Sequence, residues 1–192
     1  TSYLFREFKD YAPIINSYYL NGNTSDIIKI LSIGCSTGQE VYSLAIYCLE
    51  HNIPCEIMGI DLSESAIQKA KKAEYSLSYE LQKNLENLGS EWNNHYKKYF
   101  TITGDSLSPN TNVKQRVRFR VEDSSKLNYF SEFDFIIARK MLYYLPEKNL
   151  RDTIDSIKKA LKSGLDYSQH ILIDDFTYHK IPALKQMIYH VM

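Results

Sequence analysis

Small residues gather in a turn at residues 34–38 (GCSTG), between an apolar run at residues 30–33 and a helical pattern that follows at once. One face of that helix carries apolar residues, namely Val41, Leu44, Ala45 and Cys48. A strand, a glycine turn and a helix let a backbone approach a nucleotide-like ligand, because glycine has no Cβ and a helix start offers unpaired N–H groups. The dinucleotide fingerprint needs a third glycine, and a phosphate loop needs Gly-Lys-Ser/Thr, so a pyrophosphate is not the expected ligand. Taken alone, the turn is also compatible with a simple chain reversal.

Asp61 ends a second apolar run, residues 56–60, at about the distance from the glycine turn that one helix and one strand occupy. An acidic residue at this place holds ribose hydroxyls in nucleotide-binding folds of this kind. Asp61 with Ser63 also fits the start of a helix over residues 64–73, as a capping pair. The two roles are compatible, and both remain open from the sequence.

The elements that would position these residues alternate between strands and helices. Strands are predicted at residues 30–33, 56–60, 117–121, 134–138 and 170–173, with a last, antiparallel one at 187–191. Helices are predicted at residues 3–20, where Pro13 would bend or interrupt the helix, at 64–75 and at 147–162. Such alternation predicts an α/β fold with a mostly parallel, twisted sheet and helices on both faces. Ligands bind beyond the carboxyl ends of such strands, where residues 34–38, Asp61, Asp123 and Lys140 converge.

Residues 76–116 interrupt this alternation and predict a small inserted subdomain within a single domain of 192 residues. A helix is expected at 79–88 and a loop at 104–112, while residues 113–121 fit either the insert or the main sheet. A net charge of zero without a basic run argues against nucleic acid as a partner. Three cysteines without metal-ligand spacing are typical of a reduced, cytoplasmic protein without a metal site, and no apolar run is long enough to enter a membrane.

Several stretches resemble the chemotaxis-receptor glutamate O-methyltransferases, the CheR family, in order and spacing. The turn and helix start SxGxE(x)YS is followed by G-x-D at residues 59–61. Residues 2–7 (SYLFRE) are similar to the family's T-x-F-F-R-[ED] motif, and residues 139–145 (RKMLYYL) to its R-N-x-x-x-Y-F motif. Residues 73–75 (AEY) resemble its G-x-Y, while Tyr99-Phe100 and Val117-Arg118-Phe119 follow its Y-F…V-x-F pattern. The resemblance implies a Rossmann-like S-adenosylmethionine-dependent methyltransferase fold and, as partner, the cytoplasmic domain of a chemoreceptor or another protein acceptor.

The resemblance also implies roles for particular residues. Glu40 would bind the amino group of S-adenosylmethionine, Asp61 the ribose hydroxyls, and Leu62 would lie under the adenine. The remaining cofactor-binding residues implied are Ser2, Arg6, Gly34, Cys35, Ser36, Gly38, Asp123, Ser124, Lys140 and Met141. Arg6 and Tyr144 would lie beside the transferred methyl group, with S-adenosylhomocysteine as the product.

Each of three key residues also has an ordinary structural interpretation. Arg6 fits a surface arginine whose stem lies on apolar groups. Tyr144 fits a core tyrosine at the start of a helix. Glu40 fits a first-turn glutamate favoured by the helix dipole.

The chain departs from the family pattern at three places. Lys140 stands where the family has Asn, and a lysine there could pair with the cofactor's carboxylate or repel its sulfonium. Residues 174–177 (DDFT) replace G-H-S-E, and Asp123 replaces an Asn, which keeps an acceptor but loses a donor unless it is protonated. The family's N-terminal receptor-recognition domain is not in this sequence, which opens inside the first motif, as a trimmed or truncated domain would. In some members the corresponding insert docks a receptor peptide, but residues 76–116 match the family least, so peptide docking is not expected here.

The sequence thus predicts methyl esterification of chemoreceptor glutamates. Two alternatives remain open: a related methyltransferase with another protein or small-molecule acceptor, and a non-catalytic binding module.

Overall fold

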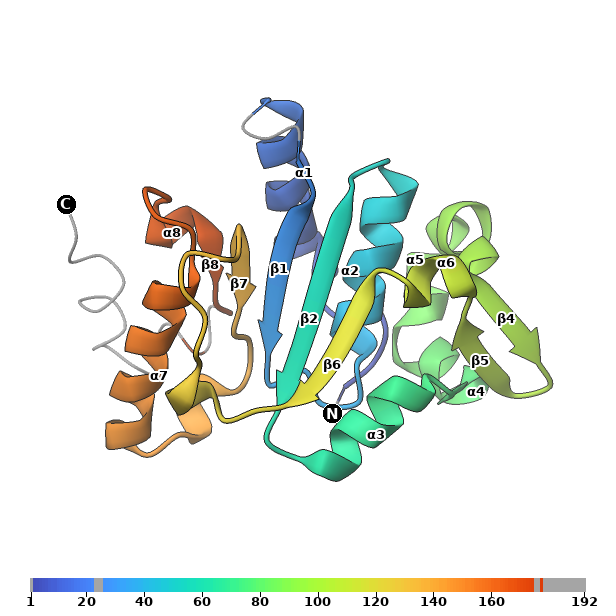
Figure 1. Ribbon diagram of the computed structural model, residues 1–192. Coiled ribbons are helices and arrows are strands. Elements are labelled where there is room, and N and C mark those ends of the chain that lie inside the picture. The colour runs from blue at the N-terminus through green and yellow to red at the C-terminus, as the bar shows by residue number, and fades with distance from the viewer. Residues whose placement is uncertain (1, 23–25, 175–176, 178–192) are drawn as a thin grey trace.

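The fold is described from a computed structural model, which covers residues 2–22, 26–174 and Thr177. Its centre is a five-stranded sheet with the strand order β6-β2-β1-β7-β8, and every neighbouring pair is parallel (Figure 1). The strands are β1 (Ile28–Ile33), β2 (Cys55–Asp61), β6 (Val117–Val121), β7 (Phe135–Ile137) and β8 (Ile171–Leu172). The predicted parallel sheet is confirmed. The strand predicted at residues 187–191 lies outside the described residues.

Helices cover both faces of the sheet, as the continuous apolar strands require. On β1, Ile28 and Ile30 pack into the core shared with α1 (Ala12–Leu20), α2 (Gln39–Glu50) and α3 (Glu64–Lys72). The alternate residues Leu31 and Ile33 face the second core, against α7 (Glu147–Ala160). Short helices complete this part of the fold: η5 (Ser124–Lys126), η6 (Leu142–Tyr144) and α8 (Tyr167–His170). Because α8 includes His170, the predicted strand at 170–173 is shorter than expected.

The predicted helix over residues 3–20 is wrong in its first half. Phe5 and Glu7 have left-handed backbone angles, with φ of 55° and 50°, which an α-helix cannot contain. A 3-10 helix, η1 (Phe8–Asp10), follows, and α1 begins only at Ala12. Pro13 then lies in the first turn of α1, where its missing N–H is no loss.

A second, antiparallel sheet with the order β3-β5-β4 lies beside the main sheet, past α3 (Figure 1). Its strands are β3 (Tyr75–Ser76), β4 (Phe100–Thr103) and β5 (Ser106–Pro109). The helices around it are α4 (Leu77–Glu80), η2 (Leu81–Leu85), α5 (Glu86–Leu88), η3 (Trp92–Tyr96), η4 (Lys97–Tyr99) and α6 (Thr111–Lys114). The prediction of a loop at 104–112 is therefore wrong. Gly104 lies in the hairpin turn between β4 and β5, and Asn110 is the N-cap of α6.

β6 settles the open choice for residues 117–121, since Phe119 pairs with Gly59 in the main sheet. An inserted subdomain at 76–116 stays a prediction. In the described part of the chain, no helix combines the length and apolarity that crossing a bilayer requires.

Candidate functional site

A pocket of about 340 Å³ opens at the carboxyl ends of the central strands, a size within the range of small-molecule sites. Its lining comes from the N-terminal segment, the turn after β1, and the segment after β7. The lining residues are Ser2, Tyr3, Arg6, Gly34, Cys35, Ser36, Glu40, Arg139, Lys140, Tyr143 and Tyr144. Eight of the predicted site residues are thus brought together, from parts of the chain more than a hundred residues apart.

The turn between β1 and α2 is held in place by the strands beside it. The backbone N–H groups of Gly34 and Cys35 both donate to the Ile60 carbonyl, at 2.9 and 3.0 Å. Gly34 and Gly38 have φ of 71° and 89°. A Cβ on Gly34 would lie 2.9 Å from the Met141 Cβ, so what the glycine permits here is close packing between two segments of the site.

Asp61 organises the turn through its carboxylate. Its Oδ2 accepts the Ser36 N–H at 2.8 Å, and its Oδ1 accepts the Ser63 N–H at 2.9 Å. Ser63 in turn accepts the Ala66 N–H as the N-cap of α3, so the capping role is confirmed. Each Asp61 oxygen keeps a second lone pair, which leaves acceptor capacity for a diol.

Apolar surface adjoins Asp61 at the strand ends. Leu62 is 73% exposed, and Val121, which pairs with Asp61 across β2 and β6, is 47% exposed. Beside the Asp61 carboxylate, which can accept from the hydroxyls of a ribose, these exposed branched side chains offer an apolar surface for the base of a nucleoside. Asp61, Leu62 and Val121 all lie outside the lining of the pocket itself.

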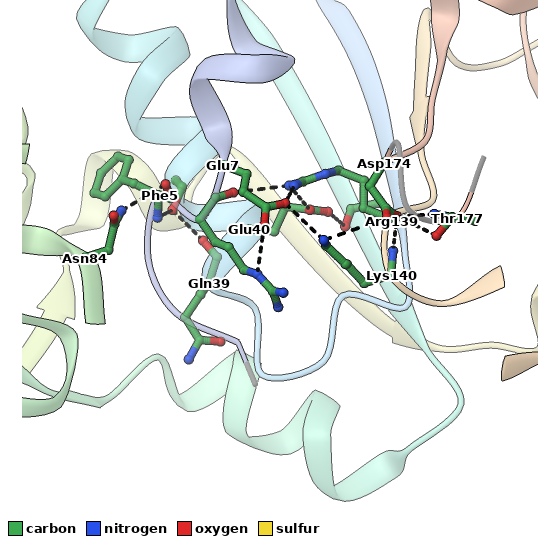
Figure 2. Close-up of polar contacts among 12 residues, drawn as sticks. Phe5, Glu7, Gln39, Glu40, Asn84, Arg139, Lys140, Asp174 and Thr177 are labelled. Carbon is green, nitrogen blue, oxygen red and sulfur yellow. Dashed lines mark hydrogen bonds and ion pairs between the residues drawn. The ribbon is translucent and has the colours of Figure 1, made fainter. Parts of the chain in front are cut away.

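Glu40 lies in the first turn of α2 and points into a polar cluster (Figure 2). Its Oε1 accepts from the Ser32 hydroxyl at 2.9 Å, and its Oε2 from Arg139 Nη1 at 3.3 Å. Burial raises the pKa of the Glu40 carboxyl, and the Arg139 charge opposes this rise. The dipole interpretation of Glu40 is therefore incomplete, since the side chain also lines the pocket.

Arg139 is a pocket residue that we did not single out from the sequence. Its guanidinium lies 4.5 Å from the ring centroid of Tyr11, donates to the Arg6 carbonyl at 3.2 Å and pairs with both Glu7 and Glu40. It therefore ties the N-terminal segment to α2. The available signal was its place at the start of the 139–145 motif, directly before Lys140.

Lys140 has its charge compensated by two carboxylates (Figure 2). Its Nζ lies 3.4 Å from Glu7 Oε2 and 3.8 Å from Asp174 Oδ1. Its backbone N–H also donates to Asp174 Oδ2 at 2.7 Å, and Thr177 donates to the same carboxylate. Two neighbouring acids weaken the repulsion that a lysine would exert on a cation in the pocket.

Arg6 and two tyrosines form the mouth of the pocket. The Arg6 guanidinium lies 5.4 Å from the Tyr3 ring centroid, and the rings of Tyr143 and Tyr144 lie 4.1 Å apart. Tyr144 is 74% exposed, so the interpretation as a core tyrosine is wrong. The Arg6 side chain is 30% exposed and lines a pocket, unlike an ordinary surface arginine.

Asp123 and Ser124 follow β6 and lie outside the pocket lining. Asp123 Oδ1 accepts from the Ser125 N–H and hydroxyl, and these bonds lower the pKa of the carboxyl. Asp123 is therefore ionised at neutral pH and acts only as an acceptor. Ser124 Oγ lies 3.3 Å from Thr153 Oγ1 on α7.

Similarity to known proteins identifies the family to which this site belongs. Residues 1–165 match the family model described as "CheR methyltransferase, SAM binding domain". The chain belongs to the CheR family. The resemblance drawn from the sequence motifs is thereby confirmed.

The relatives are longer than this chain. The "Chemotaxis protein methyltransferase 2" of Vibrio cholerae is 25% identical over 85% of this chain and 58% of its own length. The "Chemotaxis protein methyltransferase" of Campylobacter jejuni (strain 81-176) is 28% identical over 93% of this chain and 66% of its own length. Among solved structures, the PH0226 protein of Pyrococcus horikoshii matches 94% of this chain and 64% of its own at 18% identity, with a TM-score of 0.47.

S-adenosylmethionine (SAM) is the cofactor of this CheR domain, and the residues present fit it. SAM carries an ammonium, a carboxylate, a ribose diol and an adenine. The pocket offers a carboxylate on Glu40 and cations on Arg6 and Lys140, while Asp61 keeps free lone pairs beside exposed Leu62. The donor and acceptor set is thus complementary to each part of the molecule.

Proposed function

We propose that the chain transfers the methyl group of SAM to glutamate side chains in the cytoplasmic domain of a chemoreceptor, and that it acts in the cytoplasm. The observation that carries this proposal is the convergence of Arg6 and Tyr144 on the pocket that the 34–38 turn forms. Names of related CheR proteins support the choice of acceptor.

The proposed cofactor contacts follow from the position of each group. Glu40 holds the ammonium group, Asp61 the ribose hydroxyls, and Lys140 the carboxylate. Leu62 lies against the adenine, and ionised Asp123 with Ser124 accepts from its amino group. Ser2, Cys35 and Ser36 complete the wall of the pocket, and Met141 packs against Gly34 in that wall.

The chemistry asks for positioning more than for proton transfer. Bound SAM supplies an electrophilic methyl group on a positively charged sulfur. A glutamate carboxylate is ionised at neutral pH, so it would need no general base to accept that methyl group, and S-adenosylhomocysteine would leave as an uncharged thioether. Arg6 attracts the carboxylate, and the exposed Tyr144 hydroxyl donates to it, so that oxygen, carbon and sulfur lie in line.

The nature of the product tests the acceptor. The chain is incubated with methyl-labelled SAM and chemoreceptor cytoplasmic fragments, and the washed protein is treated with alkali. A glutamate methyl ester releases volatile labelled methanol. An alkali-stable label would contradict the proposal and assign a different acceptor group.

The non-catalytic alternative is tested by a matched pair of tyrosines. Tyr144→Phe should lower kcat about tenfold to a hundredfold, with little change in affinity for S-adenosylhomocysteine, because its hydroxyl touches only the acceptor. Tyr143→Phe, in the same short helix, should lower kcat by much less. If Arg6→Ala and Tyr144→Phe both leave turnover unchanged, the roles assigned to them are wrong.

A further inference from the structure

Arg6 stands on a segment whose backbone no regular element holds. Phe5 and Glu7, on either side of it, both have left-handed φ values, and the backbone hydrogen bonds here are single turns, from the Phe8 N–H to the Phe5 carbonyl at 3.5 Å and from the Asp10 N–H to the Glu7 carbonyl at 3.1 Å. A guanidinium that meets a reacting carboxylate needs a fixed backbone, because misplacement by about 1 Å can cost a hundredfold in rate. The support for Arg6 must come from elsewhere in the molecule.

Arg139 supports the Arg6 carbonyl itself, at 3.2 Å, and a set of side-chain bonds holds the two residues before Arg6. Glu80 Oε2 accepts the Leu4 N–H at 2.7 Å, and Ser43 Oγ accepts the Phe5 N–H at 2.7 Å. Asn84 donates to the Leu4 carbonyl at 3.1 Å. It also donates to the Phe5 carbonyl at 3.0 Å (Figure 2). Three side chains thus bond four consecutive backbone polar groups. Two of these side chains, Glu80 and Asn84, come from the helical run that follows β3.

Burial makes this arrangement costly to maintain without a purpose. Glu80 is 1% exposed, and its hydrogen-bond donors, the Leu4 N–H and the Gln39 amide, are neutral. Burial raises the pKa of the Glu80 carboxyl, which shows the cost of placing it here, and an apolar residue in its place would leave the Leu4 N–H without an acceptor. The Phe5 ring, stacked 4.7 Å from Tyr96, adds an apolar anchor on the same side.

We propose that Glu80 and Asn84 are positioning residues for Arg6: they fix the backbone of Leu4 and Phe5 and so aim the Arg6 guanidinium into the pocket. The helical run from Leu77 to Leu88 then sets the rate of methyl transfer without touching the substrate. This inference rests on the proposed function for its kinetic part, and on the hydrogen-bond geometry alone for its structural part.

The kinetic test is a double-mutant cycle between Asn84 and Arg6. Asn84→Ala should lower kcat/KM for the acceptor about tenfold to a hundredfold in the wild-type background. In the Arg6→Ala background the same change should cost less than about threefold, because there is no guanidinium left to aim. Asn93→Ala, an exposed asparagine of the following helix that donates within its own turn, is the matched control and should leave kcat/KM unchanged.

Equal losses in both backgrounds would overturn the proposal, since Asn84 would then act on stability or on another group. A loss with Asn93→Ala as large as that with Asn84→Ala would do the same.

Amide hydrogen exchange tests the clamp independently of any activity. In the wild-type chain the amides of Leu4 and Phe5 should be protected, and Glu80→Ala should speed exchange at Leu4 at least tenfold while Ile30 in β1 keeps its protection. Wild-type Leu4 and Phe5 amides that exchange as fast as an unstructured chain would contradict the proposal even if methyl transfer is absent. If Glu80→Ala fails to fold, Asn84→Ala replaces it in this test. Faster exchange at Leu4 and Phe5 in Asn84→Ala is the expected result, and exchange as slow as in wild type would contradict the proposal.

Discussion

Lys140 shows how a single residue changes the electrostatics of the pocket. It replaces an Asn of the family pattern and adds a cation beside the place proposed for a sulfonium. Asp174, where the pattern has a glycine, and Glu7 both lie within 4 Å of its Nζ. Asp174 departs from the family pattern together with the lysine, whereas Glu7 matches the acid of the family's first motif, and the sequence alone did not reveal that the three groups meet.

Lys140→Met should make the pocket discriminate more strongly in favour of a cation. With the lysine gone, Glu7 and Asp174 add negative potential, which attracts SAM but not the uncharged thioether of S-adenosylhomocysteine. The ratio of their dissociation constants, Kd of S-adenosylhomocysteine over Kd of SAM, should rise about threefold to tenfold in calorimetric titrations. Lys71→Met, an exposed lysine of α3, is the control, and a ratio that falls in Lys140→Met would refute this account of the charges.

At the scale of elements, predictability followed the length and apolarity of each segment. The central strands are mostly apolar and alternate with amphipathic helices, so their existence and their parallel direction could be predicted, although their order in the sheet was not. The antiparallel sheet could not, because β3 has two residues and β5 includes Ser106, Ser108 and Pro109, a composition typical of a loop. The N-terminal segment failed for another reason, since tertiary bonds from Glu80 and Asn84 override its helical periodicity.

The same limits apply to the site. Residues at predicted strand ends, such as Gly34 and Asp61, could be found from the parallel-sheet rule, whereas Glu40 was singled out only by the family resemblance. Arg139 could not be assigned its partners, because Glu7, Glu40 and Tyr11 meet it only through long-range packing. How Lys140 and Arg6 are supported is likewise a property of the tertiary structure.

Gly38 tests the packing of α2 against α3. It combines φ of 89° with a Cβ position only 2.9 Å from the Ala70 Cβ, so Gly38→Ala suffers both strain and a clash. Gly104→Ala has φ of 59° with no atom within 4 Å, and isolates the strain. In urea denaturation Gly104→Ala should lower the free energy of unfolding by about 1 kcal/mol and Gly38→Ala by about 3 kcal/mol. Equal losses of unfolding free energy in the two variants would contradict this, because they would mean that α3 moves away from the new Cβ without loss of stability.

At the scale of the whole molecule, Glu50 joins the end of α2 to the segment before β4. Its carboxylate accepts from Lys98 at 2.6 Å, His95 at 2.8 Å and Tyr99 at 2.9 Å. Burial alone raises the pKa of Glu50, but these hydrogen bonds outweigh it and lower the pKa to about 2. The main sheet and the second sheet are therefore linked by a charge that acid removes.

The folded-state pKa of Glu50 lies below its unfolded value of about 4.3, so its contribution to stability is complete above that value. It declines as pH falls from about 4.3 towards 2, because the unfolded chain takes up the proton first. Thermal unfolding should show Glu50→Gln about 2–6 °C below wild type at pH 7, with a smaller difference at pH 3. A difference in Tm that stays constant over this range would contradict the assigned pKa.

The central claim is that SAM binds at the strand ends, in the pocket and on Asp61, which lies outside the lining and accepts from Ser36 of the pocket wall. The most direct test is calorimetric titration of wild type, Asp61→Ala and Asp166→Ala with S-adenosylhomocysteine. Asp166 is the matched control, because its carboxylate also accepts a backbone N–H, from Ser168 at 2.8 Å, but lies at the start of α8. The account predicts micromolar binding by wild type and Asp166→Ala, and binding at least about a hundredfold weaker by Asp61→Ala. No binding by the folded wild-type chain, or equal binding by all three, would contradict it.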